Sequence, residues 1–250
     1  MIRLMKADFY RLSKTVGLYM TLLAVVALGV LSVVSEASIS VGVNVEDIAR
    51  TWTLPYLMKN AVMASPILTY VFISIFIILI GHEFSLKTYK NSLTAGTSRL
   101  TFLLAKYVTE LLVLVLATFL FFMAVLVAGV MKYGLAGADL FSIFSDMLLS
   151  SVMTGIMISV LFGLATLILI SVQSSVLAAV FTVMYPLIMQ ITASVTKWEN
   201  IKYFDFFGFA QMIGLNQLTL NESIPYLVVG SITILLSIVG SVFVIKHKEL

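Results

Sequence analysis

The 250-residue chain contains no cysteine, which excludes disulfide bonds, redox thiols and thiolate metal sites. Charged residues make up only 11% of it, less than half of the about 25% that is typical of a soluble globular domain. No Gly-Lys dipeptide occurs, so the chain lacks the Walker A motif GxxxxGK[ST] and its phosphate-binding loop. The composition therefore excludes a soluble domain, and the missing motif excludes an ATPase of the Walker A kind.

What the chain has instead is long uncharged stretches, and 61% of its residues are hydrophobic. An α-helix needs about 20 apolar residues to cross roughly 30 Å of hydrocarbon. The run from Met147 to Thr196 would be about 75 Å long as one helix, so it must fold back, and Gln173-Ser174-Ser175 is its polar break. The sequence predicts an all-α membrane protein, a single domain over 1–250, with spans at about 16–34, 60–82, 103–131, 147–172, 175–196 and 223–245.

The distribution of Lys and Arg predicts the orientation of these spans, because cytoplasmic segments of membrane proteins carry the excess of positive charge. The termini, 82–106 and 173–175 together hold ten basic and three acidic residues, whereas the segments 35–59, 132–146 and 197–222 hold five basic and eight acidic ones. Both termini and the segment 82–106 are thus predicted to be cytoplasmic. The net charge of +3 reflects this bias and gives no support to nucleic-acid binding.

Residues 1–15 have the pattern of an amphipathic helix lying at the membrane interface. The apolar residues share one arc and the basic residues lie elsewhere: Met1, Ile2, Met5, Phe9, Leu12 and Val16 against Arg3, Lys6, Arg11 and Lys14. Two interpretations stay open. The helix is either an anchor that fixes the first span or an elbow that moves with the bundle.

The fourth span carries small residues at four-residue spacing, namely Ser151, Gly155, Ser159 and Gly163. Such a ladder allows a neighbouring helix to approach closely, within one chain or between two. It is therefore predicted to be a helix-packing surface.

An aromatic segment precedes the last span, over 198–221. Its rings are Tyr203, Phe204, Phe206, Phe207 and Phe209. Aromatic side chains at this density belong at a membrane interface. The segment is predicted to form short helices that enter the outer leaflet as a re-entrant hairpin and act as an outer gate; the alternative is an aromatic belt without further role.

Candidate catalytic residues are few. His82-Glu83 begins like the zinc motif HExxH, but Leu86 stands where the second histidine is required, so neither a metal site nor a catalytic residue is predicted. Glu110 is the only charged residue expected inside the membrane, and an ionisable group at that depth is by default a candidate for a functional role. The structural alternative is a carboxyl that snorkels to the membrane interface or pairs with Lys106, four residues earlier on the same helix.

The polar segment 82–106 interrupts the apolar sequence and is the best candidate for contact with a cytosolic partner. A helix is expected to continue from Glu83 to Lys90, Thr94-Ala95-Gly96 to break it, and Thr97 or Ser98 to cap the third span. Exposed Phe84, Tyr89 and Leu93 among basic residues would suit docking into a groove on another protein. The alternative is a hairpin whose charges only fix the topology.

The same segment resembles the permeases of ABC-2 type exporters. The matching pattern is a Glu at the end of the second span, a Thr-containing helix, a small-residue turn and Ser-Arg-x-x-x-x-L-x-K opening the third span: Glu83, Thr88, Gly96, Ser98, Arg99, Leu104 and Lys106. The basic amphipathic start resembles the N-terminal elbow of that family, and the aromatic segment its re-entrant hairpin. One departure is that the family commonly has Gly-Thr where this chain has Lys87-Thr88.

This resemblance implies a non-enzymatic permease subunit in the bacterial cytoplasmic membrane, moving amphipathic or hydrophobic peptides or antimicrobials outward. A separate cytosolic ATPase, carrying ATP and Mg²⁺, would bind the coupling loop 83–98 through Glu83, Phe84, Lys87, Thr88, Tyr89, Lys90 and Arg99. Because six spans are half of an exporter, a second permease copy or a related permease is implied, besides membrane lipids. The main alternative is a membrane scaffold or sensor subunit that recruits a cytosolic partner without transport. An intramembrane enzyme is disfavoured by the positions of the acids and histidines.

Overall fold

The computed structural model describes residues 1–36, 52–135, 139–196 and 198–248, and in these residues all regular structure is helical. Six helical segments are long and apolar enough to cross a membrane, which confirms the predicted class and the number of spans. They are α2 (Val16–Val34), the segment Leu54–Ser85, α7 (Arg99–Tyr133), α8 (Leu140–Val172), α9 (Ser175–Thr196) and α11 (Leu220–Lys248).

Helices α2 and α9 have the same bounds as the apolar runs at 16–34 and 175–196, whereas the other four helices are longer than their apolar runs. A helix propagates past the apolar run until a cap stops it. Ser98 caps α7 by accepting a hydrogen bond from the Thr101 N–H at 3.2 Å, as predicted, and Asp139 caps α8 through the Phe141 N–H at 3.0 Å. The predicted break between the fourth and fifth spans is also present, where Gln173 has φ +57°.

The second span is a composite of helical types. Its parts are α3 (Leu54–Ala64), the 3-10 turn η1 (Ser65–Ile67), α4 (Leu68–Phe76), the π-helical turn η2 (Ile77–Gly81) and α5 (His82–Ser85). Pro66 lies in η1, where it has no N–H to give to an α-helical hydrogen bond. The short helix α6 (Tyr89–Thr94) follows α5, and Gly96, with φ +87°, separates α6 from α7 as predicted.

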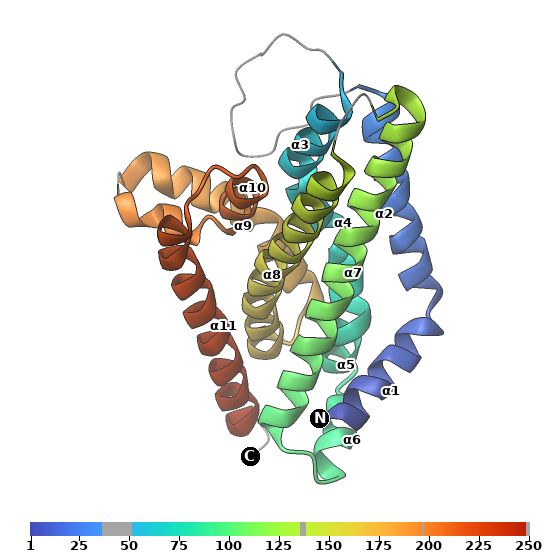
Figure 1. The fold of residues 1–250 in the computed structure, drawn as a ribbon. Coiled ribbons are helices and arrows are strands. Elements are labelled where there is room, and N and C mark those ends of the chain that lie inside the picture. Colours follow the sequence, from blue (N-terminus) through green and yellow to red (C-terminus); the bar gives the residue numbers. More distant parts are fainter. Residues whose placement is uncertain (37–51, 136–138, 197, 249–250) are drawn as a thin grey trace.

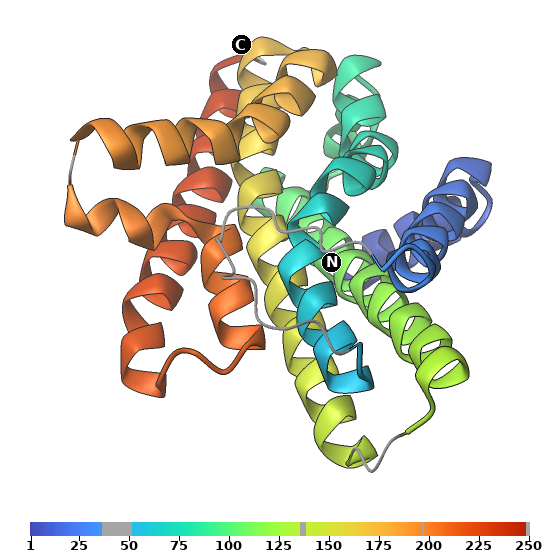
Figure 2. The same ribbon diagram turned by 90° about the horizontal axis from the view of Figure 1, so that it is seen from above.

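Helices α7 and α8 form the centre of the bundle (Figure 1). Helix α7 packs against α2, α3, α8, α11 and α1 (Ile2–Ser13), and α8 packs against α9, α10 (Phe206–Gly214) and α11. Seen from above, α1 and α2 lie on one side of this centre and α9 to α11 on the other (Figure 2). The largest fully buried side chains of these two helices are phenylalanines: Phe102, Phe121, Phe122 and Phe162.

The ladder on α8 makes its contacts with α7 and α11 of the same chain. A Cβ added at Gly155 would lie 2.7 Å from Val115 Cγ2 and 3.0 Å from Val115 Cα on α7. Ser159 makes a hydrogen bond of 2.8 Å with the Tyr107 hydroxyl, also on α7, and Gly163 faces Ser237 of α11. Small residues thus let three spans come together.

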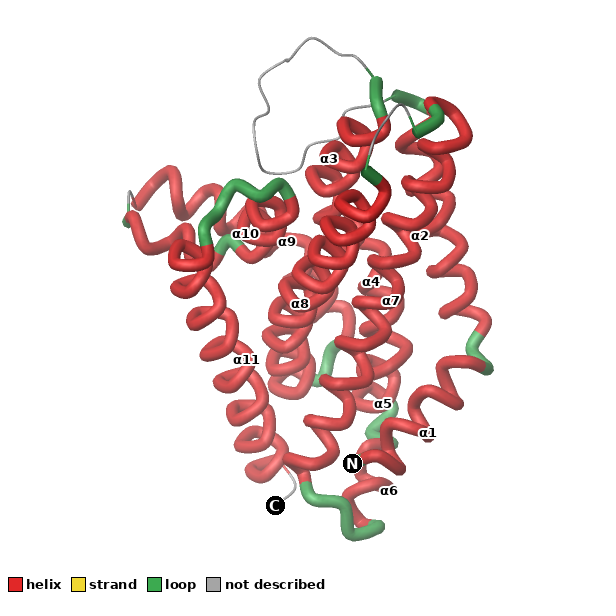
Figure 3. Tube along the Cα trace, in the orientation of Figure 1, coloured by secondary structure: helices red, strands yellow, loops and turns green. Residues whose placement is uncertain are grey.

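The two ends of the bundle differ in what they carry. The N-terminus, α1, α6 and the last turn of α11 lie at one end, here called the α6 end, and α3 and α10 lie toward the other, the α3 end (Figure 1). The turns that join α5, α6 and α7 form a small projection at the α6 end (Figure 3). An even number of spans places both termini at this end, as expected.

Candidate functional site

An ion-pair network joins three elements at the α6 end. Lys106 Nζ of α7 donates to Asp8 Oδ1 of α1 at 2.6 Å and to Glu83 Oε1 of α5 at 2.7 Å. Arg11 of α1 donates through Nη1 to the same Glu83 oxygen and through Nη2 to the carbonyl oxygen of Leu79 in η2 at 2.9 Å. Two carboxyls and two cationic side chains therefore tie α1, the second span and the start of α7 together.

Most of this network is shielded from solvent. Lys106 is 4% exposed and Asp8 6% exposed, and the side chain of Glu83 is 13% exposed. Burial raises the pKa of the Asp8 carboxyl, and the neighbouring Lys106 ammonium offsets part of that rise. Because removing one partner from a buried ion pair leaves an uncompensated charge, the three elements are expected to move as one body.

The network also explains why the predicted pair between Lys106 and Glu110 is wrong. The two residues share a face of α7, but the Lys106 ammonium donates instead to the carboxyls that α1 and α5 bring to it. Glu110 is fully buried, and its carboxyl accepts no hydrogen bond from the described residues. Sequence spacing alone places these residues within reach but does not show which partner is closer.

The helix predicted to run from Glu83 to Lys90 is interrupted, which corrects the expected shape of the coupling loop. Helix α5 ends at Ser85, and Lys87 adopts φ +57° before α6 begins. This left-handed conformation costs a residue with a side chain about 1–2 kcal/mol and favours glycine. A glycine at position 87 would relax this turn. The Thr88 hydroxyl lies 3.4 Å from the Glu83 carbonyl oxygen.

The prediction that Phe84 and Tyr89 are exposed is wrong. Their rings stack on each other at 4.6 Å, Phe84 also meets Phe102 of α7 edge to face at 6.1 Å, and Phe84 and Tyr89 are 3% and 5% exposed. The turn buries its two rings against α7 because rings that pointed outward without a partner would lie in water. Among the predicted contact residues, the exposed ones are Lys87, Thr88 and Lys90, while Arg99 is half-buried.

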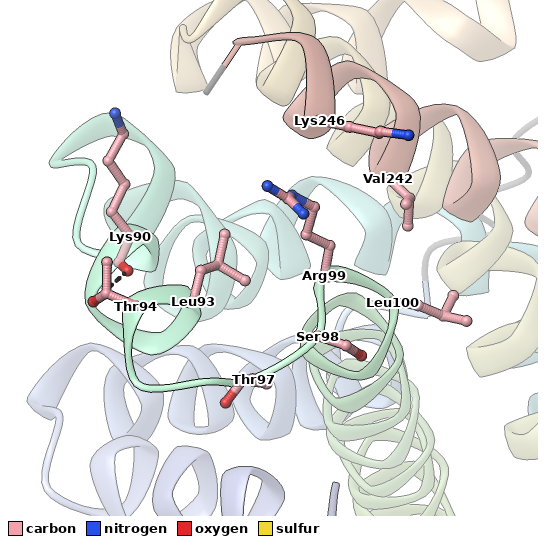
Figure 4. A pocket seen from close by; sticks show the side chains of 9 residues that line it. All are labelled: Lys90, Leu93, Thr94, Thr97, Ser98, Arg99, Leu100, Val242 and Lys246. Carbon is pink, nitrogen blue, oxygen red and sulfur yellow. Dashed lines mark hydrogen bonds between the residues drawn. The ribbon is translucent and has the colours of Figure 1, made fainter. Parts of the chain in front are cut away.

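A groove of about 670 Å³ opens at the α6 end between α6, the start of α7 and the end of α11 (Figure 4). Its described lining residues are Lys90, Leu93, Thr94, Thr97, Ser98, Arg99, Leu100, Val242 and Lys246. Three of these are cationic and none of them is acidic, and Lys90 and Lys246 are exposed. The groove can therefore receive an acidic surface, with Leu93, Leu100 and Val242 supplying apolar contacts.

The aromatic segment forms two short helices at the α3 end, η3 (Glu199–Phe204) and α10. Asp205 caps α10 by accepting a hydrogen bond from the Gly208 N–H at 3.0 Å. Phe206 lies parallel to Tyr185 of α9 at 5.9 Å, and Phe209 to Tyr226 of α11 at 4.6 Å.

These rings close the space between the spans rather than face outward. Phe206, Phe207 and Phe209 are buried, and Tyr203 and Phe204 are half-buried. The Gln211 side chain also donates to the Met63 carbonyl oxygen of α3 at 2.7 Å, which ties α10 to the second span. The expected short helices are present, and a gating role stays a prediction.

The described residues bring no group of three or more His, Asp or Glu side chains together that could hold a metal ion. Comparison with protein-family models, curated proteins and solved structures found no significant match to the chain. The interpretation of the site therefore depends on its geometry.

The contacts that Asp8, Arg11 and Lys106 make in the ion-pair network are not among the sequence-based predictions. The sequence offers one hint, because Asp8 is the single acid in residues 1–15, which carry four cations. Those cations are themselves possible partners, so the sequence does not single out Lys106.

Proposed function

We propose that this chain is the membrane permease of an ATP-driven exporter of the ABC-2 type, with the turn-and-helix segment 83–98 as the element that binds a cytosolic ATPase. The observation that carries the proposal is the ion-pair network. It fastens the base of that segment to α1 and α7, so that a force applied to the segment reaches two helices of the bundle.

The division of the segment into a buried and an exposed part supports this role. Phe84, Tyr89 and Glu83 hold it to the bundle, and Lys87, Thr88 and Lys90 face outward. The basic groove beside it gives the ATPase surface a place to bind, and that surface is expected to carry acidic residues. In this mechanism, ATP-driven closure of two ATPase subunits shifts α5, α6, α1 and the start of α7 together, and the movement separates the spans.

The proposed substrate is an amphipathic or hydrophobic peptide or antimicrobial, moved outward across the bacterial cytoplasmic membrane by a pair of permeases. The described spans offer such a substrate apolar side chains, and the aromatic cluster at the α3 end would close the exit between cycles. Both roles follow from the ABC-2 resemblance.

The test is a double charge reversal in the groove, Lys90→Glu with Lys246→Glu. The binding partner is the ABC ATPase encoded beside the permease gene, co-expressed and purified with it. We expect the double variant to lose most of the ATPase from the complex. The matched control is Lys202→Glu, an exposed cation in η3 toward the α3 end, which should leave binding unchanged.

Equal ATPase recovery with the double variant and the control would overturn the assignment of the groove. A permease that retains the ATPase but moves no substrate with ATP would favour the alternative function, a membrane scaffold that recruits a cytosolic protein.

A further inference from the structure

A small cavity lies inside the bundle between η2, α7, α8 and α11. Its volume is about 20 Å³, and its described lining residues are Ile80, Leu103, Lys106, Tyr107, Glu110, Gly163, Thr166, Ser237, Ile238 and Ser241. Glu110 is 0% exposed and Ser241 is 1% exposed. Neither carboxyl oxygen of Glu110 has a hydrogen-bond partner among the described residues, and the Ser241 hydroxyl has none there either. Two unpaired polar groups from different spans therefore border one cavity.

The other hydroxyl groups of the lining have already used their hydrogens. Thr166 donates to the Phe162 carbonyl at 2.8 Å, and Ser237 donates to the Thr233 carbonyl at 2.7 Å. Ser159 gives its hydrogen to the Ile156 carbonyl, so the Tyr107 hydroxyl donates to the Ser159 oxygen at 2.8 Å. Among the hydroxyl groups of the lining, only Ser241 therefore keeps a hydrogen to give to the Glu110 carboxyl, and the others offer oxygen lone pairs.

The charged groups near the cavity do not compensate an ionised Glu110. The titratable lining residues are Lys106 and Tyr107, both on α7, and the lining residues of η2, α8 and α11 are apolar or hydroxyl-bearing. The Lys106 ammonium is bonded to Asp8 and Glu83. Moving an isolated carboxylate from water into a medium of low dielectric costs tens of kcal/mol by Born solvation, so such groups become neutral instead.

We propose that Glu110 is a proton-binding site: in this packed arrangement its carboxyl carries a proton, and it donates that proton to a single water that bridges Glu110 and Ser241. The volume agrees, because about 10–15 Å³ of this kind of space is enough for one water. The bridge supplies a hydrogen bond to both groups that otherwise have none.

Opening of the bundle is then linked to proton release. Ser237 and Ser241 bring α11 to the cavity, and separating α11 from α7 and α8 admits water to Glu110 and removes the cost of ionising it. The proton leaves as the helices part and returns as they close. The open arrangement is therefore favoured as the pH rises.

Infrared spectroscopy of the purified permease, without any ATPase, tests the site directly. At neutral pH the wild type should show the carbonyl stretch of a protonated, buried carboxylic acid, and Glu110→Gln should lose it. Asp146→Asn, which changes an exposed acid near the α3 end, is the control and should keep the band. Ser241→Ala should shift the band, because it removes one partner of the bridging water.

A wild type without this band would overturn the proposal, and an unshifted band in Ser241→Ala would overturn the bridge. Thermal unfolding gives a second measure: the wild-type Tm should fall relative to that of Glu110→Gln as the pH rises, because the folded chain holds a proton that the unfolded chain releases. If replacing choline chloride by NaCl at one pH raises the wild-type Tm and not that of Glu110→Gln, the site holds a metal cation and the proposal is wrong.

Discussion

Replacing Lys106 with methionine removes the centre of the ion-pair network while keeping a side chain of similar length. In the variant, Asp8 and Glu83 lie in the same buried space with only Arg11 as a cationic partner. Two carboxyls that two cations had neutralised would then share the one cation that remains. The expected result is a loss of stability and of the connection between α1, α5 and α7.

The magnitude follows from what breaking such a pair costs. Removing one partner of a buried ion pair destabilises a protein by about 3–5 kcal/mol. For a chain of this size, each kcal/mol changes the Tm by about 2–4 °C, so Lys106→Met should unfold about 6–20 °C below the wild type. Exposed Lys90 gives the matched control, since Lys90→Met should change the stability by no more than about 0.5 kcal/mol.

The assay is thermal unfolding of the purified permease in detergent, for the wild type, Lys106→Met, Asp8→Asn and the double variant. If the two residues act through each other, the double variant should lose less stability than the two single losses added together, by about 0.5–3 kcal/mol. A Tm of Lys106→Met within about 2 °C of the wild type would refute the reasoning, since it would mean that the network holds nothing in place.

Three further predictions concern other features of the chain. Lys87→Gly should raise the free energy of unfolding by about 1 kcal/mol by relaxing the left-handed turn, and Lys87→Ala should not; equal effects in chemical denaturation would contradict this. Gly155→Ala should lower the Tm by the equivalent of about 1–3 kcal/mol because its Cβ meets the Val115 backbone, whereas Gly163→Ala, whose nearest contact is 3.6 Å, should be tolerated. Because burial raises the pKa of Asp8, this carboxyl stabilises the fold most at low pH and less as the pH rises through its folded value. The Tm of the wild type relative to that of Asp8→Asn should accordingly fall as the pH is raised above about 4. A Tm difference that grows with pH would contradict this prediction.

Features set by local chemistry could be predicted from the sequence. The apolar runs predict six spans, Ser98 caps α7, and Gln173 and Gly96 end helices as expected. The ladder on α8 identifies a packing surface because a residue without a large side chain leaves room for another helix wherever it stands. These features depend on neighbours in the chain.

The candidate site depended on contacts between distant residues, and there the sequence was less informative. Lys106 has a possible partner four residues away, but its actual partners are 98 and 23 residues away in the chain. Phe84 and Tyr89 have the spacing of exposed docking residues only if the helix is continuous, and the turn at Lys87 folds them onto Phe102 instead. A left-handed lysine carries no sequence signal of its own.

Transport by the reconstituted complex tests the central claim most directly. The permease and the ATPase encoded beside it would be inserted into lipid vesicles with a fluorescent amphipathic peptide, and movement of the peptide would be followed with ATP and with a non-hydrolysable analogue. The proposed function predicts ATP-dependent movement in the wild type, its loss in the variant carrying Lys90→Glu and Lys246→Glu, and its retention in Lys202→Glu. An intact complex that hydrolyses ATP while the peptide distribution stays the same with and without ATP would contradict it.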